Sequence, residues 1–196
     1  PEFQSFCEKA GRACYGATEL PLLLDISRQL NNSRNIKEDL DSILEFIAQY
    51  LNAERAIITI INRENSNIFI ERGYGLSEEA KARGVYRIGE GVIGKVVKNG
   101  EPVIIPRILK DNTYLNRTRS KLLTSDRRHI TFICVPVKAE DRITGTLSID
   151  LAHNENENYE EKVRLLTIIG SMIVQFVRAR QDRLEEIEGL KEENSK

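Results

Sequence analysis

The sequence predicts an α+β domain, in which a central antiparallel β-sheet carries the N- and C-terminal helices on one face and a lidded ligand pocket on the other. Three observations indicate this fold class. Apolar residues recur at spacings of three and four near both ends of the chain, which is the period of an amphipathic helix. Between the ends lie two pairs of β-branched runs, each joined by a polar turn as in a hairpin. A long basic segment separates the hairpins.

The first part of the chain supplies two helices and a hairpin. Residues 20–30 and 36–51 have one apolar face each, and Asn35 is a typical N-cap for the second helix. Residues 56–61 and 68–71 are expected to pair as strands across a polar turn. We expect residues 1–18 to be a tail, whose opening Pro1-Glu2-Phe3 is interpreted as cloning residue.

Residues 86–106 are a glycine-rich segment with the pattern of a strand, a tight turn, a short helix and a second strand. Gly91 permits a close backbone approach or a positive φ where the helix begins. Val92 and Ile93 start the apolar face of that helix. The segment is either one wall of a ligand pocket or a structural crossover between strands.

Residues 107–129 show no clear helical or strand period, and loops of this length inside a compact domain are commonly functional. Seven basic and two acidic residues give the segment a local charge of +5. Guanidinium groups pair well with carboxylates and phosphates, so we interpret the segment as a lid over a small anion. The alternative is a solvated surface loop. The candidate anion contacts are Arg107, Arg117, Arg127 and Arg128.

Residues 130–137 and 143–151 form the second predicted hairpin. Pairing about its turn brings Cys134 near Ser148 and Phe132 near Asp150. Because side chains alternate along a strand, one face is apolar and meets the helices, and the other is mixed and suits a pocket floor. The mixed face carries Phe132, Cys134, Pro136, Thr146, Ser148 and Asp150. We expect Cys134 to be a packed, unreactive thiol, since no base is predictable beside it.

A helix is predicted from Tyr159 to near the end of the chain. Its apolar stripe thins after Phe176, and residues 181–196 are interpreted as a helical linker toward a further domain. The net charge of −1 favours neither nucleic acid nor membrane binding, and no apolar run is long enough to span a bilayer. Three scattered cysteines favour a reducing, cytoplasmic location and do not suggest a metal site.

The assembled order of elements resembles that of the GAF domain, a family of small-molecule sensory modules. The resemblance covers residues 19–180 and includes Arg87-Ile88-Gly89-Glu90-Gly91-Val92-Ile93-Gly94 and Gly145-Thr146-Leu147-Ser148-Ile149-Asp150. Gly75-Leu76-Ser77-Glu78-Glu79 and Leu115-Asn116-Arg117-Thr118 narrow it to the N-terminal GAF domain of NifA-type activators of σ54-dependent transcription. The second of these motifs lies inside the lid, where GAF domains in general would not be expected to agree.

The resemblance implies a regulatory domain of a nitrogen-fixation activator that precedes an AAA+ ATPase and a DNA-binding domain. The chain has no phosphate-binding loop of the ATPase type, so it is expected neither to hydrolyse ATP nor to bind nucleic acid directly. No cofactor is fixed by the sequence. Ligands in the family include cyclic nucleotides and 2-oxoglutarate, and either is a possible effector here. A homodimer through the N- and C-terminal helices is expected to transmit the signal.

Two other functions are compatible with the residues. One is a ligand-free module for dimerisation or partner-protein binding, favoured by the large side chains around Phe132 and Cys134. The other is enzymatic, because some GAF domains reduce free methionine sulfoxide with cysteines near the pocket. Cys7 and Cys14 lie in the tail, which leaves Cys134 alone, and we therefore expect no enzyme activity.

Overall fold

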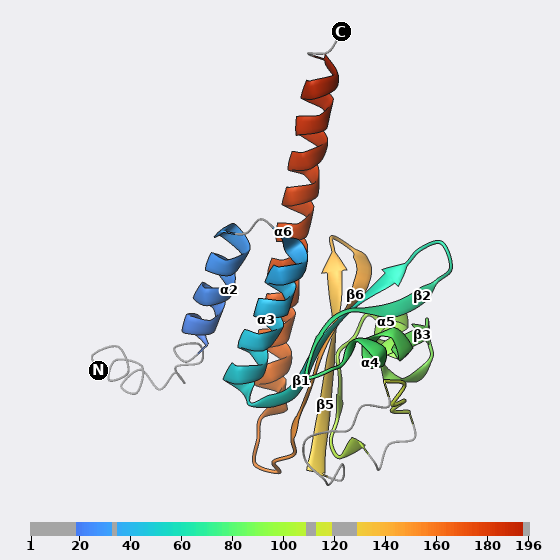
Figure 1. The fold of residues 1–196 in the computed structure, drawn as a ribbon. Helices are drawn as coiled ribbons and strands as arrows, with labels where there is room; N and C mark the ends of the chain where they lie inside the picture. The colour runs from blue at the N-terminus through green and yellow to red at the C-terminus, as the bar shows by residue number, and fades with distance from the viewer. Residues whose placement is uncertain (1–18, 33–34, 109–112, 119–128, 194–196) are drawn as a thin grey trace, which may run out of the picture.

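The computed structural model describes residues 19–32, 35–108, 113–118 and 129–193, the last twelve of these by their backbone alone (Figure 1). Six strands form one antiparallel sheet in the order β3-β2-β1-β6-β5-β4. The strands are β1 (Ala53–Asn62), β2 (Asn67–Tyr74), β3 (Val85–Arg87), β4 (Val103–Ile105), β5 (Ile130–Ala139) and β6 (Arg142–Ala152). The predicted α+β class with a central antiparallel sheet is confirmed.

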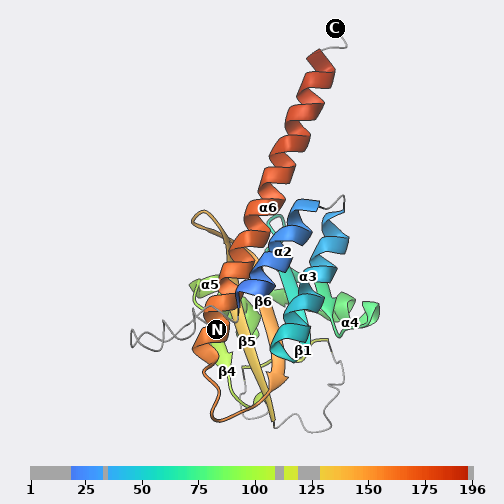
Figure 2. The same ribbon diagram turned by 90° about the vertical axis from the view of Figure 1, so that its left-hand side faces the viewer.

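Helices cover the two faces of the sheet unequally. The long helices α2 (Leu20–Asn32), α3 (Ile36–Leu51) and α6 (Tyr159–Glu193) lie side by side on one face, as Figures 1 and 2 show. The short helices α4 (Glu78–Arg83) and α5 (Gly91–Asn99) lie on the other side. The predicted tail, residues 1–18, lies outside the described part of the chain.

The main hydrophobic core lies between the sheet and the three long helices. It contains Ile43, Ile47, Leu166 and Ile169 from the helices, together with Ile133, Val135, Leu147 and Ile149 from the hairpin of β5 and β6. A second, smaller core on the opposite face joins Phe132 and Cys134 to α5. The register Cys134↔Ser148 and Phe132↔Asp150 agrees with the predicted pairing. Because side chains alternate along β5, one of its faces packs in the main core and the other faces the side of the sheet where a site is expected.

Local signals in the sequence explain where several elements begin. The side chain of Asn35 accepts a hydrogen bond of 3.1 Å from the Lys37 amide at the start of α3. Ser77 accepts one of 3.3 Å from the Ala80 amide and so caps α4. Each side chain satisfies an amide that the first turn of its helix leaves without a backbone partner. The structure therefore confirms the predicted start of α3 at the Asn35 cap.

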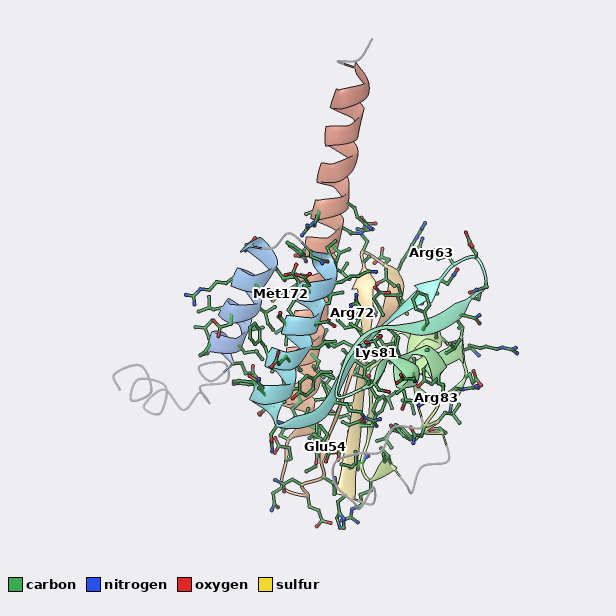
Figure 3. The ribbon with its side chains drawn as sticks, viewed as in Figure 1. Glu54, Arg63, Arg72, Lys81, Arg83 and Met172 are labelled. Carbon is green, nitrogen blue, oxygen red and sulfur yellow. The ribbon has the colours of Figure 1, made fainter. Side chains whose placement is uncertain are left out.

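Helix α6 is 35 residues long, which corresponds to about 52 Å. Its first half packs on the main core through Val163, Leu166, Ile169 and Ile173. Met172, labelled in Figure 3, is partly buried against the same core. The remainder of the helix rises past the end of the sheet, away from the other elements (Figure 1).

Gly145 is required by the close contact between β6 and β1. A Cβ at this position would lie 1.8 Å from the backbone oxygen of Thr59. We expect Gly145→Ala to lower the free energy of unfolding by about 2–4 kcal/mol, because the paired strands would have to separate. Urea denaturation measures the change, with Arg142→Ala on the exposed start of β6 as the control. Equal stability of the two variants would contradict this close contact.

Candidate functional site

A small cavity lies on the sheet face opposite the long helices, below α5 and the lid segment 113–118. Its volume is about 20 Å³, enough for one water molecule. In this conformation it has no room for a nucleotide or a dicarboxylate. The lining residues are Arg55, Ile57, Tyr86, Val92, Ile93, Tyr114, Leu115, Asn116, Thr118 and Phe132.

Arg55 is the charged group of this cavity. Arg55 on β1 is 3% exposed, and Asp150, the residue opposite it on β6, is 1% exposed. Arg55 Nε donates a hydrogen bond of 2.5 Å to Asp150 Oδ2. The other end of the guanidinium donates to the lid, through Nη2 to Tyr114 Oη at 3.2 Å and through Nη1 to Thr118 Oγ1 at 3.5 Å. One buried side chain thus joins two strands and the lid.

Burial and ion pairing act against each other at this pair. Burial lowers the pKa of Arg55, but the Asp150 carboxylate and the Tyr114 phenol raise it by more. The pKa therefore lies above its usual value, and the guanidinium stays charged. Burial raises the pKa of Asp150, and the contact with Arg55 offsets part of that increase. Because a buried guanidinium without a carboxylate would be very costly, we take the pair as ionised.

Residues 113–118 are held against the cavity by packing and by hydrogen bonds from a second arginine. The ring of Tyr114 meets that of Phe132 edge to face, with centroids 5.2 Å apart. Arg83, labelled on α4 in Figure 3, donates from Nη2 and Nε to the Thr118 carbonyl at 2.8 and 3.2 Å. Leu115 lies over Gly91, where a Cβ would come within 2.9 Å of its side chain. Gly91, with φ +60°, therefore permits both the helix start and the close approach of the lid.

A wider groove of about 420 Å³ lies beside the cavity and shares Tyr86 with it. Its other lining residues are Asn67, Val85, Arg87, Glu90 and Arg117. Arg117 forms an ion pair with Glu90, whose second oxygen accepts a hydrogen bond of 2.9 Å from the Arg87 amide. That backbone hydrogen bond, together with the nearby Arg117, lowers the pKa of Glu90. Consecutive lid residues, Asn116 and Arg117, line the cavity and the groove respectively.

The structure brings together only part of the predicted site. Val92, Ile93 and Phe132 line the cavity, and Arg117 lines the groove. Arg107 lies elsewhere, in an ion pair with Glu155, and Arg127 and Arg128 are outside the described residues.

Apart from Phe132, the predicted floor residues Cys134, Pro136, Thr146, Ser148 and Asp150 do not line the cavity. Thr146 Oγ1 is hydrogen-bonded to Thr59 Oγ1 at 2.7 Å, and Asp150 holds Arg55. Within the described part of the chain, the buried hydroxyl of Ser148 has no hydrogen-bond partner.

Sequence reasoning missed Arg55, Tyr86 and Tyr114, although a signal for the first was present. Arg55 is a lone arginine next to the apolar run 56–61, where every second side chain is expected to be buried. A charged side chain at such a position requires a buried partner. Asp150, which the sequence predicts on the mixed face of the second hairpin, is a carboxylate that could pair with Arg55.

Cys134 lies beneath the cavity and is fully buried. Burial raises the pKa of its thiol to about 12, although a hydrogen bond with Thr146 acts in the opposite direction. Nucleophilic and redox reactions of cysteine need an accessible thiolate. The environment of Cys134 is therefore that of a packed structural thiol.

The GAF domain family model matches residues 35–175, which include the sheet, α5, the lid and the first part of α6. The chain belongs to the GAF domain family. It is 31% identical over 158 residues to the nitrogen fixation protein VnfA of Azotobacter vinelandii, covering 81% of this chain and 30% of VnfA. It is 29% identical to the Nif-specific regulatory protein of Azospirillum brasilense, covering 86% of this chain and 27% of that protein. The chain thus spans less than a third of the length of these relatives.

Solved GAF structures show the same fold. The A. aeolicus nlh2 GAF domain, crystallised in an inactive state, is 25% identical, with a TM-score of 0.72 and coverage of 83% of this chain and 97% of the other. A free methionine-R-sulfoxide reductase from Neisseria meningitidis is 13% identical with a TM-score of 0.68, covering 83% and 89%. At 13% identity, the similarity to the reductase concerns the fold alone. The relatives by sequence are named as a nitrogen fixation protein and a Nif-specific regulatory protein.

Two further properties concern the described residues. They contain no group of three or more His, Cys, Asp or Glu side chains placed to hold a metal ion. Within the same ranges, no helix has both the length and the apolar character needed to cross a bilayer.

The buried pair of Arg55 and Asp150 should be strongly coupled. We expect Arg55→Met or Asp150→Leu alone to lower the free energy of unfolding by about 3–5 kcal/mol, because each leaves a buried charge without its partner. The decrease in the free energy of unfolding of the double variant should be smaller, by at least about 1 kcal/mol, than the sum of the decreases in the two single variants. Urea denaturation of the four proteins measures this coupling.

The surface pair of Arg28 and Asp25, whose side chains are 72% and 57% exposed, is the matched control. Asp25→Ala should change stability by less than about 1 kcal/mol. Strictly additive effects at Arg55 and Asp150 would contradict the coupling.

The thiol of Cys134 should resist alkylation in the folded protein. With a pKa of about 12, it is ionised in roughly one molecule in ten thousand at pH 8. In a variant with Cys7→Ser and Cys14→Ser, we expect iodoacetamide to modify Cys134 at least about a thousandfold more slowly in buffer than in denaturing urea. Mass spectrometry measures both rates. Comparable rates would show that the thiol is accessible and would reopen an enzymatic function.

Proposed function

We propose that this chain is the small-molecule-sensing GAF domain of a NifA-like activator of σ54-dependent transcription. The domain binds a small anionic metabolite or nucleotide between the sheet, α5 and the lid. It controls a downstream AAA+ ATPase through paired N- and C-terminal helices of a homodimer. It acts in the cytoplasm as a non-catalytic regulator. The ligand-contacting set consists of Gly91, Val92, Ile93, Arg117 and Phe132, with Arg127 and Arg128 of the basic lid.

The observation that carries the proposal is the buried, charged guanidinium of Arg55 at the cavity. Its Nε is paired with Asp150, but its terminal nitrogens face the cavity and contact neutral hydroxyl groups, and buried charged groups at a cavity are frequent at functional sites. The lid, α5 and the groove around Arg117 surround the same position. The similarity to Nif-specific regulatory proteins adds support for a sensory role.

The arrangement of the two faces supports signal output through α6. The cavity is on one face of the sheet, and α6 packs on the other through the shared strands β5 and β6. Since α6 continues beyond the sheet, a change in its packing moves the far end of the helix. Ligand binding would shift the population between two such packings.

A ligand-free module for dimerisation or partner binding is the second candidate. The cavity volume of about 20 Å³ favours it, because a binding site for a metabolite is normally some hundreds of Å³. Exposed apolar side chains on the helical face favour it as well, namely Leu20, Leu24 and Ile168. The two candidates differ in whether the lid opens for a ligand.

A thermal-shift screen separates the two candidates. The domain is heated at fixed salt with 2-oxoglutarate, cyclic nucleotides, ADP, ATP or glutamine. A ligand at about 100 times its dissociation constant should stabilise the folded state by roughly 2.7 kcal/mol, a rise of a few degrees in Tm. Arg117→Ala, at the groove, should reduce the shift produced by any ligand found.

Arg107→Ala is the control for the screen, because Arg107 belongs to the same basic segment but pairs with Glu155 away from the cavity. Its shift should equal that of the unmodified protein. An unchanged Tm with every compound would favour the module for dimerisation or partner binding.

A further inference from the structure

Arg55 has two ends with different partners. Its Nε is matched to a carboxylate, Asp150, at 2.5 Å. Its two terminal nitrogens instead meet neutral hydroxyl groups of the lid, Tyr114 at 3.2 Å and Thr118 at 3.5 Å. The second of these distances is at the outer limit of a hydrogen bond. The end of the guanidinium that faces the cavity is therefore the less well satisfied end.

Carboxylates and phosphates are better partners for such a fork than hydroxyl groups. They accept two parallel, charge-assisted hydrogen bonds, which are shorter and about twice as strong as neutral ones. The positive end of α5 lies at the same cavity, because Val92 and Ile93 of its first turn line it. The N-cap residue of α5, Glu90, makes no side-chain capping bond. These features favour a negative charge beside Arg55.

The two lid hydroxyl groups lie where such an anion would bind. Tyr114 and Thr118 both contact Arg55, and of the residues between them Leu115 and Asn116 line the cavity while Arg117 lines the groove of about 420 Å³. Outward movement of this segment would join the two spaces. It would also remove the acceptors of both terminal nitrogens, so an incoming anion could replace them.

We propose that Arg55 is the receptor for the ligand's carboxylate or phosphate group, and that Tyr114 and Thr118 of the closed lid occupy it as an internal ligand. Binding exchanges these two hydroxyl groups for the anion and opens the lid. The inference rests on the proposed sensory function, and it assigns the anion contact to a strand residue that the basic lid covers.

The first measurement needs no ligand. Tyr114→Phe with Thr118→Val removes both hydroxyl groups but keeps the ring against Phe132 and the shape of residue 118. We expect the amides of residues 113–118 to exchange hydrogen about tenfold faster in this double variant than in the unmodified chain. Tyr74→Phe, which removes an exposed hydroxyl at the end of β2, is the control and should leave that rate unchanged. Unchanged exchange in the double variant would overturn the role of the lid as internal ligand.

The second measurement is calorimetric titration with 2-oxoglutarate and with inorganic phosphate, which distinguishes a carboxylate ligand from a phosphate ligand. The double variant should bind one of them at least about tenfold more tightly than the unmodified chain, since no hydroxyl competes. Arg55→Lys keeps the charge but loses the fork, and should weaken binding by about tenfold or more. If Arg55→Lys folds poorly, the affinity of the double variant alone tests the role of Arg55.

The outcomes separate this inference from the function beneath it. Binding of either probe that is equal or weaker in the double variant overturns the assignment of Arg55, while sensing of an anion stands. The assignment is also overturned if neither the unmodified chain nor the double variant binds either probe. If the thermal-shift screen is then also negative, the sensory function fails with it.

Discussion

The buried ion pair of Arg55 and Asp150 is the interaction on which the arrangement of the candidate site depends. It crosses from β1 to β6 and leaves the far end of the guanidinium to hold the lid through Tyr114 and Thr118. A pair this deeply buried contributes little net stability, because desolvation offsets the Coulomb attraction. Its contribution is a fixed orientation, since the carboxylate determines which side of the guanidinium faces the cavity. The position of the lid depends on that orientation.

The sheet then connects the site to the helical face. The first residues of β5 come directly after the lid in sequence, and Thr131 Oγ1 lies 2.8 Å from His153 Nδ1 and 3.2 Å from the hydroxyl of Tyr159. Tyr159 is the first residue of α6, and its hydroxyl also accepts a hydrogen bond of 2.7 Å from the Asn154 amide. The start of β5, the end of β6 and the start of α6 thus share one polar cluster.

The sequence predicted the fold well because local signals determine it. Hairpin turns set the strand register, and caps such as Asn35 set the helix starts. The site was predicted less well, because its decisive contacts join distant positions. Arg55 and Asp150 are 95 residues apart, and the charges of Arg107 and Arg117 are paired by Glu155 and Glu90 from other elements. Net charge along the lid gave no information about which of its arginines is already engaged.

If residues 113–118 fill the ligand pocket as proposed, they also lower the affinity that would be measured for a ligand. If only a fraction of the molecules has an open lid, the apparent dissociation constant is the intrinsic one divided by that fraction. The edge-to-face contact of Tyr114 with Phe132, the bonds from Arg83 and the bonds to Arg55 all favour the closed state. A ligand would therefore have to form stronger contacts than the lid does, and its binding would be selective for groups that match a guanidinium fork. On this proposal, the contacts that close the pocket also determine which ligands are able to open it.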